Sequence, residues 1–142
     1  MRTIRLVSLA IVSIALSACS FGPNSNAAFE SEHNARSALD WAGTYRGVLP
    51  CADCEGIATV VTLEDDGTYQ TRSEYLGRGG VAFEEKGRFN WNAAGNTVTL
   101  GESEPALYFV AENRLIRRAQ DGSPITGPLA DAYVLEKDPE SN

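Results

Sequence analysis

Short runs of alternating apolar and polar residues, separated by turn residues, are the feature that most limits how this chain can fold. Within residues 57–63, one face of the run is occupied at period two, as in a half-buried strand, by Ile57, Thr59, Val61 and Leu63. Asp66-Gly67 follows this run, and an Asp-Gly pair supplies the positive φ angles of a tight hairpin. We therefore expect residues 57–63 and 68–75 to pair as antiparallel strands.

The same pattern continues to the C-terminus and predicts about eight strands with no long helix. The expected strands cover residues 41–48, 57–63, 68–75, 83–91, 97–100, 107–111, 115–118 and 133–137. Residues 124–131 are irregular and can hold a single helical turn. An antiparallel sheet of this size leaves exposed edges unless it closes. We therefore predict an all-β fold, a small antiparallel barrel that is closed or nearly closed.

Two local features interrupt the expected strand pattern. Glu85 breaks the apolar face of residues 83–91, which indicates either a strand end or a polar site in the interior. The glycine-rich run 77–80 lacks the lysine and the following helix of a phosphate-binding loop. We interpret it as a flexible loop at the barrel rim, where it can contact a partner.

The first 18 residues have the pattern of a secretory signal peptide, which is removed from the mature protein. Arg2 and Arg5 precede an apolar stretch at 6–16, and the small residues Ser17 and Ala18 end the segment. The apolar stretch is shorter than the roughly 20 residues that a membrane-spanning helix needs.

Residues 16–19, Leu-Ser-Ala-Cys, resemble the lipobox at which bacterial lipoproteins are cleaved and acylated. We therefore predict that Cys19 carries lipid, because two or more acyl chains, at about 0.8 kcal/mol per buried methylene, hold a protein stably on a membrane. The alternative is a chance cysteine near an ordinary cleavage site. Ser20 follows in place of Asp, and in the Gram-negative sorting scheme this implies attachment to the outer membrane, facing the periplasm.

The mature chain divides into a tether and a folded domain. Residues 19–38 are rich in Ser, Asn and Ala and are expected to form the lipidated cysteine and a flexible tether. The folded domain is expected at 39–142. His33, the single histidine, lies in the tether with no ligand-spaced partners, which argues against a metal site there and against a Ser-His-Asp triad.

The chain has three cysteines, and assigning Cys19 to the lipid leaves Cys51 and Cys54 as a pair. They lie between the first and second expected strands. The oxidising periplasm favours a disulfide across the two intervening residues. For so short a loop the chain-entropy estimate is about 2 kcal/mol, so the bond would shape the loop more than hold the domain together.

Two other chemistries could use the same pair. A thioredoxin-type thiolate needs a helix N-terminus, whereas the residues after Cys54 lead into a strand, and Asp53 and Glu55 disfavour a nearby thiolate. In the reduced form, Cys51 and Cys54 could hold Cu(I) or supply half of a zinc site. Copper would then be the only cofactor, and its remaining ligands would have to come from elsewhere.

The charge balance excludes one broad class of partner. The chain has 12 Lys and Arg against 19 Asp and Glu, a formal net charge of −7. Such a surface repels a phosphate backbone, so we expect no nucleic-acid binding.

The chain resembles the N-terminal domain of NlpE-type copper-homeostasis lipoproteins. The resemblance rests on residues 45–57, which include both loop cysteines, and on 66–69, 87–91, 127–130 and 133–137. It implies a lipocalin-like barrel, outer-membrane attachment through Cys19, and a role in copper tolerance or envelope-stress sensing with a signalling protein as partner. It also implies that Cys51 and Cys54 are the family's paired cysteines. Longer members carry a second domain, and signalling that depends on it is not expected of a chain ending at Asn142.

Our functional hypothesis is a non-enzymatic binding or sensing module with a redox-sensitive loop at the barrel rim. One alternative is a carrier of a small hydrophobic ligand, in which Tyr69, Phe83, Phe89 and Trp91 line a cavity instead of filling the core. The other is a periplasmic lipoprotein that inhibits an enzyme by presenting loops to it.

Overall fold

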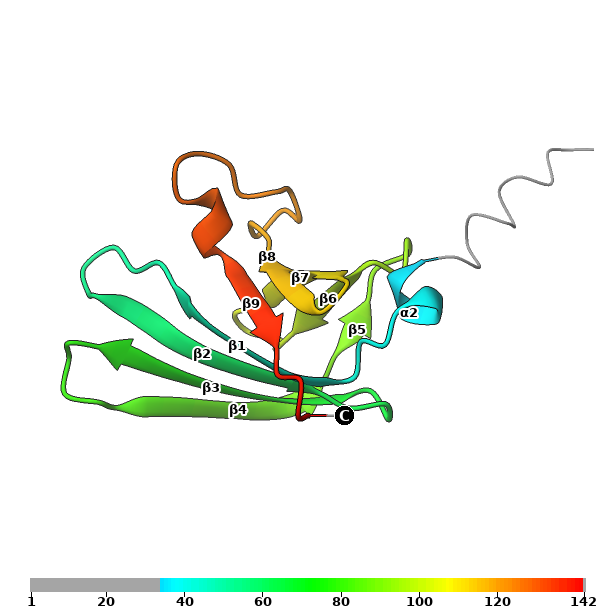
Figure 1. Ribbon diagram of the computed structural model, residues 1–142, viewed down its shortest axis with the longest axis horizontal. Coiled ribbons are helices and arrows are strands. Elements are labelled where there is room, and N and C mark those ends of the chain that lie inside the picture. Colours follow the sequence, from blue (N-terminus) through cyan, green and yellow to red (C-terminus); the bar gives the residue numbers. More distant parts are fainter. Residues whose placement is uncertain (1–33, 142) are drawn as a thin grey trace, which may run out of the picture.

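Nine antiparallel strands form one continuous sheet that curls into a nearly closed barrel (Figure 1). The computed structural model describes residues 34–141. The strands are β1 (Gly43–Leu49), β2 (Gly56–Leu63), β3 (Thr68–Leu76), β4 (Ala82–Arg88), β5 (Asn90–Trp91), β6 (Thr97–Leu100), β7 (Ala106–Ala111), β8 (Arg114–Arg117) and β9 (Val134–Lys137). A short helix, α2 (Ala35–Ala38), precedes them, and a 3-10 turn, η1 (Ala130–Ala132), precedes β9. The predicted signal peptide 1–18, Cys19 and His33 lie outside the described residues.

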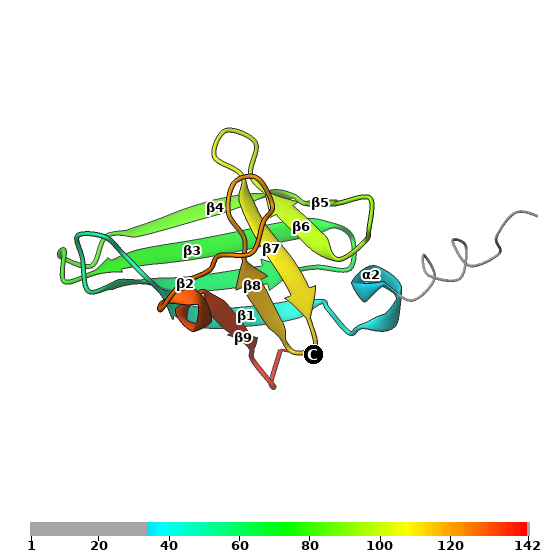
Figure 2. The ribbon, with the colours of Figure 1, turned by 90° about the horizontal axis from the view of Figure 1, so that it is seen from above.

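The strand order shows how the sheet closes. The order is β4-β3-β2-β1-β9-β8-β7-β6-β5, so the first and last strands of the chain meet in the middle of the sheet. The pairs Tyr45↔Lys137 and Arg46↔Glu136 join β1 to β9. Strands β6 to β8 then cross over the long strands β1 to β4 at an angle (Figure 2). The predicted all-β, nearly closed antiparallel barrel is confirmed.

The strand expected at 83–91 is divided in two, which gives nine strands instead of eight. Its first part, β4, pairs with β3, and its last part, β5, pairs with β6. Phe89 lies between them, and its N–H donates to the Gly67 carbonyl at 3.0 Å. The two edges of the sheet are thus consecutive in the chain, and the backbone itself bridges the seam at which the ladder changes partner.

The core is made by the inward-facing alternate positions of the strands. Its buried members are Tyr45, Leu49, Val61, Leu63, Tyr69, Phe89, Val98, Leu100, Tyr108, Val110, Leu115 and Leu135. At one end of the barrel, Trp41 packs edge-to-face on Phe89 and Trp91, with ring centroids 5.7 Å and 5.5 Å away. Such aromatic contacts add to the stabilisation from burial, so this end of the barrel is filled by side chains.

Residues 34–38, which precede the expected domain boundary at 39, pack onto the barrel. The Asn34 side chain caps α2 by accepting from the Ser37 N–H at 3.2 Å. The Arg36 N–H donates to the Gly95 carbonyl at 3.0 Å, and Ala35 packs against the core. Residues 34–38 are therefore a docked helix and not part of a tether, because the cap and the contact with the β5–β6 turn hold them.

Two smaller expectations concern helices. The helical turn expected within 124–131 is present as η1, shifted by one residue toward the C-terminus. Over residues 34–141, no helix has the length and apolar character needed to cross a membrane.

Tyr45 places a polar group inside the core and satisfies it locally. The side chain is fully buried, and its hydroxyl donates to the Trp41 carbonyl at 2.6 Å. Burial, together with the nearby carboxylate of Asp40, raises the pKa of Tyr45 to about 12. The hydroxyl therefore stays neutral in the folded state while the unfolded tyrosine ionises near pH 10.

We expect Tyr45→Phe to lower the free energy of unfolding by about 1 kcal/mol near neutral pH, because the Trp41 carbonyl loses its donor. The raised pKa contributes stability that is complete below about pH 10 and disappears as the pH rises toward about 12. The difference between the two proteins should therefore shrink at about pH 11. Chemical denaturation at both pH values measures it, and a difference that grew with pH would contradict the assignment.

Candidate functional site

A disulfide joins Cys51 and Cys54 in the loop between β1 and β2, which we call the rim loop (residues 50–55). The S–S distance is 2.08 Å and the two Cα atoms are 5.3 Å apart. Both cysteines are partly exposed. Strand β2 begins two residues after Cys54, so a strand and not a helix follows the second sulfur. The arrangement therefore lacks the helix N-terminus that activates a thioredoxin-type thiolate.

Gly56 allows the chain to return sharply from the rim loop into β2. Its φ of +154° lies in a region that L-residues rarely adopt. A Cβ at this position would also lie 2.5 Å from Cγ1 of Val48 on β1. The sequence therefore uses glycine here for both backbone conformation and space.

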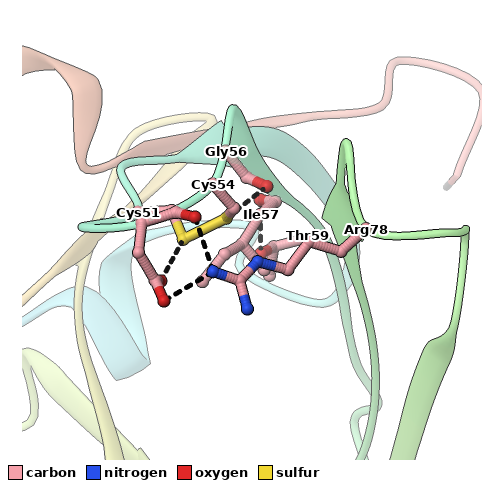
Figure 3. Close-up of a disulfide and its surroundings, with 7 residues drawn as sticks. Cys51, Cys54, Gly56, Ile57, Thr59 and Arg78 are labelled. Carbon is pink, nitrogen blue, oxygen red and sulfur yellow. Dashed lines mark hydrogen bonds and ion pairs between the residues drawn. A yellow bond between two sulfur atoms is a disulfide. The ribbon is translucent and has the colours of Figure 1, made fainter.

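Arg78, from the turn between β3 and β4, fastens the rim loop from the side (Figure 3). Its Nη2 donates to the Asp53 carbonyl oxygen at 2.7 Å and to Asp53 Oδ2 at 2.6 Å. A backbone hydrogen bond also joins the rim loop to the end of β3, because the Glu55 N–H donates to the Leu76 carbonyl at 3.4 Å. The glycine-rich run 77–80 does lie at the rim, and through Arg78 it contacts the rim loop.

The pair between Arg78 and Asp53 orients the loop but adds little stability. Their side chains are 53% and 74% exposed, and ion pairs in such positions contribute less than about 1 kcal/mol. Sequence reasoning missed this contact. The sequence does show one cation in the glycine-rich run, Arg78, and one acid between the two cysteines, Asp53. Nothing in the sequence indicates that the two loops meet, because only the fold brings them together.

Two oxygen atoms lie next to the sulfurs of the disulfide. Cys51 Sγ lies 3.7 Å from Asp53 Oδ1, and Cys54 Sγ lies 3.3 Å from the Gly56 carbonyl oxygen. Disulfide sulfurs carry no hydrogen, so in the oxidised form these are contacts only.

A copper ion does not fit this donor set. The two sulfurs are bonded to each other, and within residues 34–141 no group of three His, Cys, Asp or Glu side chains is placed to hold a metal. The guanidinium of Arg78 also pairs with Asp53, the carboxylate that contacts Cys51 Sγ. A metal would need prior reduction of the disulfide and ligands from another molecule, so we derive no step through copper.

Three of the four aromatic residues considered as cavity-lining fill the core. Tyr69 and Phe89 are buried, and Trp91 packs on Trp41. Phe83 differs, because its side chain is 58% exposed and packs edge-to-face on Tyr75 with the ring centroids 5.8 Å apart. The four residues therefore do not line one common cavity.

Glu85 lies within β4 on the row that faces inward, but its side chain is exposed, so it marks neither a strand end nor a buried polar site. The Tyr69 hydroxyl donates to Glu85 Oε1 at 2.7 Å. Burial, followed by this hydrogen bond, raises the pKa of Tyr69 to about 12. Gly87 leaves room for the tyrosine, since a Cβ there would lie 3.0 Å from Cε1 of the ring. A cleft of about 940 Å³ between β4 and residues 101–104 follows the seam of the barrel next to this pair.

We expect the double variant Cys51→Ala/Cys54→Ala to fold and to lose about 2 kcal/mol of unfolding free energy, because the bond closes a very short loop. Denaturation in guanidinium chloride measures the loss. The matched control, Arg78→Gln, should lose less than about 1 kcal/mol. Failure of the double variant to fold would mean that the disulfide supports the barrel as a whole.

Comparisons with known proteins agree with this geometry. The NlpE N-terminal domain model matches residues 45–128, which include the rim loop and the β3–β4 turn. Lipoprotein NlpE of Escherichia coli K12 is 37% identical over 99 residues, and the match spans 66% of this chain but only 39% of that protein. The 17 kDa lipoprotein of Treponema pallidum is 31% identical over 109 residues, covering 67% of this chain and 69% of that one.

Two solved structures are similar to this chain. One belongs to a Shewanella oneidensis protein described as a lipoprotein, with a TM-score of 0.71 and 43% identity, covering 75% of this chain and 96% of that one. The other is the Cpx pathway activator NlpE from Escherichia coli, with a TM-score of 0.50 and 36% identity. That match covers 60% of this chain and 46% of the other.

Proposed function

The chain belongs to the NlpE N-terminal domain family, and from this membership we propose that it is a non-enzymatic lipoprotein that senses or binds a signal in the bacterial envelope. The observation that carries the proposal is the family match over residues 45–128, which spans the rim loop with its disulfide. The barrel supplies the scaffold, and the rim loop supplies the contact surface.

The signalling part of the proposal comes from one relative. The Escherichia coli protein is described as an activator of the Cpx pathway, and this chain spans 39% of its length. We therefore assign to this chain only a contact that the shared barrel can make. Its partner would be an envelope-stress signalling protein.

The rim loop is suited to such a contact by its exposure and its chemistry. Ala52, Asp53 and Glu55 are exposed, and the disulfide beside them holds the loop in one shape. Reduction would release Cys51 from Cys54 and leave only Arg78 and the backbone to hold the loop. The redox state of the envelope would thus change the surface offered to a partner.

We propose that the lipid on Cys19 anchors the protein to the outer membrane, with the barrel in the periplasm. Both curated relatives are named lipoproteins, which supports acylation. The outer membrane as the destination follows from Ser20 under the Gram-negative sorting scheme.

We expect the full chain, produced in a Gram-negative host, to incorporate a fatty-acid probe and to sediment with outer-membrane vesicles. Cys19→Ala should abolish both, since one residue provides the attachment point. Labelling with an alkynyl palmitate and density fractionation are the measurements. The replacement Ser20→Asp should keep the label but move the protein to the inner membrane. A Cys19→Ala chain that stays with membranes would contradict the lipid anchor.

We expect the full chain to raise a Cpx-dependent reporter in a host strain that lacks its own NlpE. Cys51→Ala/Cys54→Ala should lower this response at equal protein levels, because the rim loop loses its fixed shape. Arg114→Gln is the matched control, since this exposed residue lies on β8 at the end of the strand away from the rim loop. Growth of the same strains on copper measures tolerance.

Two outcomes would contradict different parts of this proposal. An inactive chain at normal levels in the outer membrane would exclude signalling through the barrel. A double cysteine variant as active as the unsubstituted chain would keep the signalling role but remove the rim loop from it.

A further inference from the structure

A cleft of about 440 Å³ lies at the end of the barrel where Trp41 and Trp91 pack. Its walls come from α2, from the residue Trp41 before β1, from the β2–β3 turn and from the junction of β4 with β5. Figure 1 shows α2 and β5 together at this end of the molecule, with the β1–β2 and β3–β4 loops at the other end. The cleft is therefore separate from the rim loop.

Two tryptophan rings supply the apolar part of the cleft. Trp41 and Trp91 are both partly exposed, and their ring planes are inclined at 77° with the centroids 5.5 Å apart. Phe89 is buried and packs edge-to-face on both rings, with centroids at 5.7 Å and 6.1 Å. The Trp41 Nε1–H also donates to the Arg36 carbonyl at 3.0 Å. The aromatic surface is thus held in place before a ligand arrives, which lowers the entropy cost of binding.

Charged side chains line the same cleft, and their charges balance. Asp65 and Asp66 come from the β2–β3 turn, Arg36 comes from α2, and Arg88 comes from the end of β4. All four are exposed and therefore open to a ligand. Two carboxylates and two guanidinium groups give this lining no net formal charge, which favours a neutral ligand over an anion or a cation.

Much of the hydrogen-bonding capacity of the lining is unused within residues 34–141. The side chains of Arg36, Asp65 and Asn90 form no hydrogen bond or ion pair with any residue of this range. Asp66 Oδ1 accepts from the Thr68 N–H at 2.9 Å and from its hydroxyl at 2.6 Å, whereas Oδ2 has no such donor there. Free donors and free acceptors therefore surround the two tryptophan rings.

We propose that this cleft binds a neutral saccharide, a pyranose unit with equatorial hydroxyl groups as in a β-linked glucan chain. Such a ring carries axial C–H bonds on both faces, which pack on aromatic surface. Each hydroxyl both donates and accepts, so one sugar uses carboxylates, guanidinium groups and an amide together. Trp41 and Trp91 contact the ring, Asp65 accepts from a hydroxyl, and Arg36 and Asn90 donate. The site goes beyond the proposed function and does not depend on it.

Intrinsic fluorescence tests the proposal specifically, because Trp41 and Trp91 are the only tryptophans in the chain and both line the cleft. The full chain, in a detergent without a sugar headgroup, is titrated with cellotriose and, in parallel, with triacetylchitotriose. We expect at least one sugar to give a saturable change with a dissociation constant of about 1 mM or tighter. Tighter binding of cellotriose assigns the cleft to a plain glucan, and tighter binding of triacetylchitotriose assigns it to an amino-sugar chain.

Two comparison compounds separate the contacts. Sorbitol keeps the hydroxyl groups without a ring face, and tetramethylammonium is a cation that aromatic rings and carboxylates attract. We expect both to bind at least about tenfold more weakly than the better sugar, since sorbitol loses the contact with the rings and the cation meets two guanidinium groups.

Neighbouring substitutions locate the site. Asp65→Ala should weaken sugar binding about tenfold, the loss of one charge-assisted hydrogen bond. The matched control is Glu64→Ala, because Glu64 is an exposed carboxylate next in the chain that does not line this cleft, and it should bind as the unsubstituted chain does. Trp91→Leu should also weaken binding about tenfold, measured through Trp41. If that variant does not fold, the comparison of Asp65→Ala with Glu64→Ala decides.

Three results would overturn the proposal. The first is the absence of a saturable change with either sugar at about 10 mM, ten times the expected constant. The second is equal sugar affinity of Asp65→Ala and Glu64→Ala, and the third is tighter binding of tetramethylammonium than of either sugar, which would make the cleft a cation site. None of these results bears on the Cpx reporter, because every substitution leaves the rim loop unchanged.

Discussion

Closure of the sheet is the constraint on which the rest of this structure depends. An antiparallel sheet with free edges exposes unpaired backbone groups, and here both edges meet at Phe89, where β4 ends and β5 begins. At that residue the two edge strands are joined by the backbone itself and not by a ladder of hydrogen bonds. Because β5 is only two residues long, the seam is held near the aromatic end of the barrel, where Trp41 and Trp91 pack. The rim loop lies at the opposite end of the barrel, between the end of β1 and the start of β2.

The sequence predicts most of the fold because the fold depends on short-range patterns. Alternation at period two and the Asp66-Gly67 turn specify the β2–β3 hairpin, and its register follows from them. The loop cysteines are close in sequence, so their disulfide was also predictable. The division at Phe89 was not, because alternation continues through it and only the change of partner strand marks the break. Helix α2 was missed because four residues carry too little periodicity and depend on contact with the β5–β6 turn.

The functional contacts were harder to predict because they are tertiary. Arg78 and Asp53 are 25 residues apart in the sequence, and each alone looks like a solvated charge. Arg117 and Arg118 look equivalent, and only strand register decides that the first faces inward. A shift of one residue would exchange their environments. Composition and charge counts therefore exclude classes of partner, but they do not identify which cation carries chemistry.

The β3–β4 hairpin is the segment that contacts the rim loop from the side. Its turn carries Arg78, which holds the rim loop from outside, and its inner face carries Tyr75 and Phe83. Any change that displaces this hairpin would therefore act on the segment that positions the rim loop. Thermodynamic coupling between the disulfide and a partner requires that the rim loop have two arrangements with different affinities for that partner. If the loop has only one arrangement, reduction of the disulfide leaves partner binding unchanged and produces no regulation.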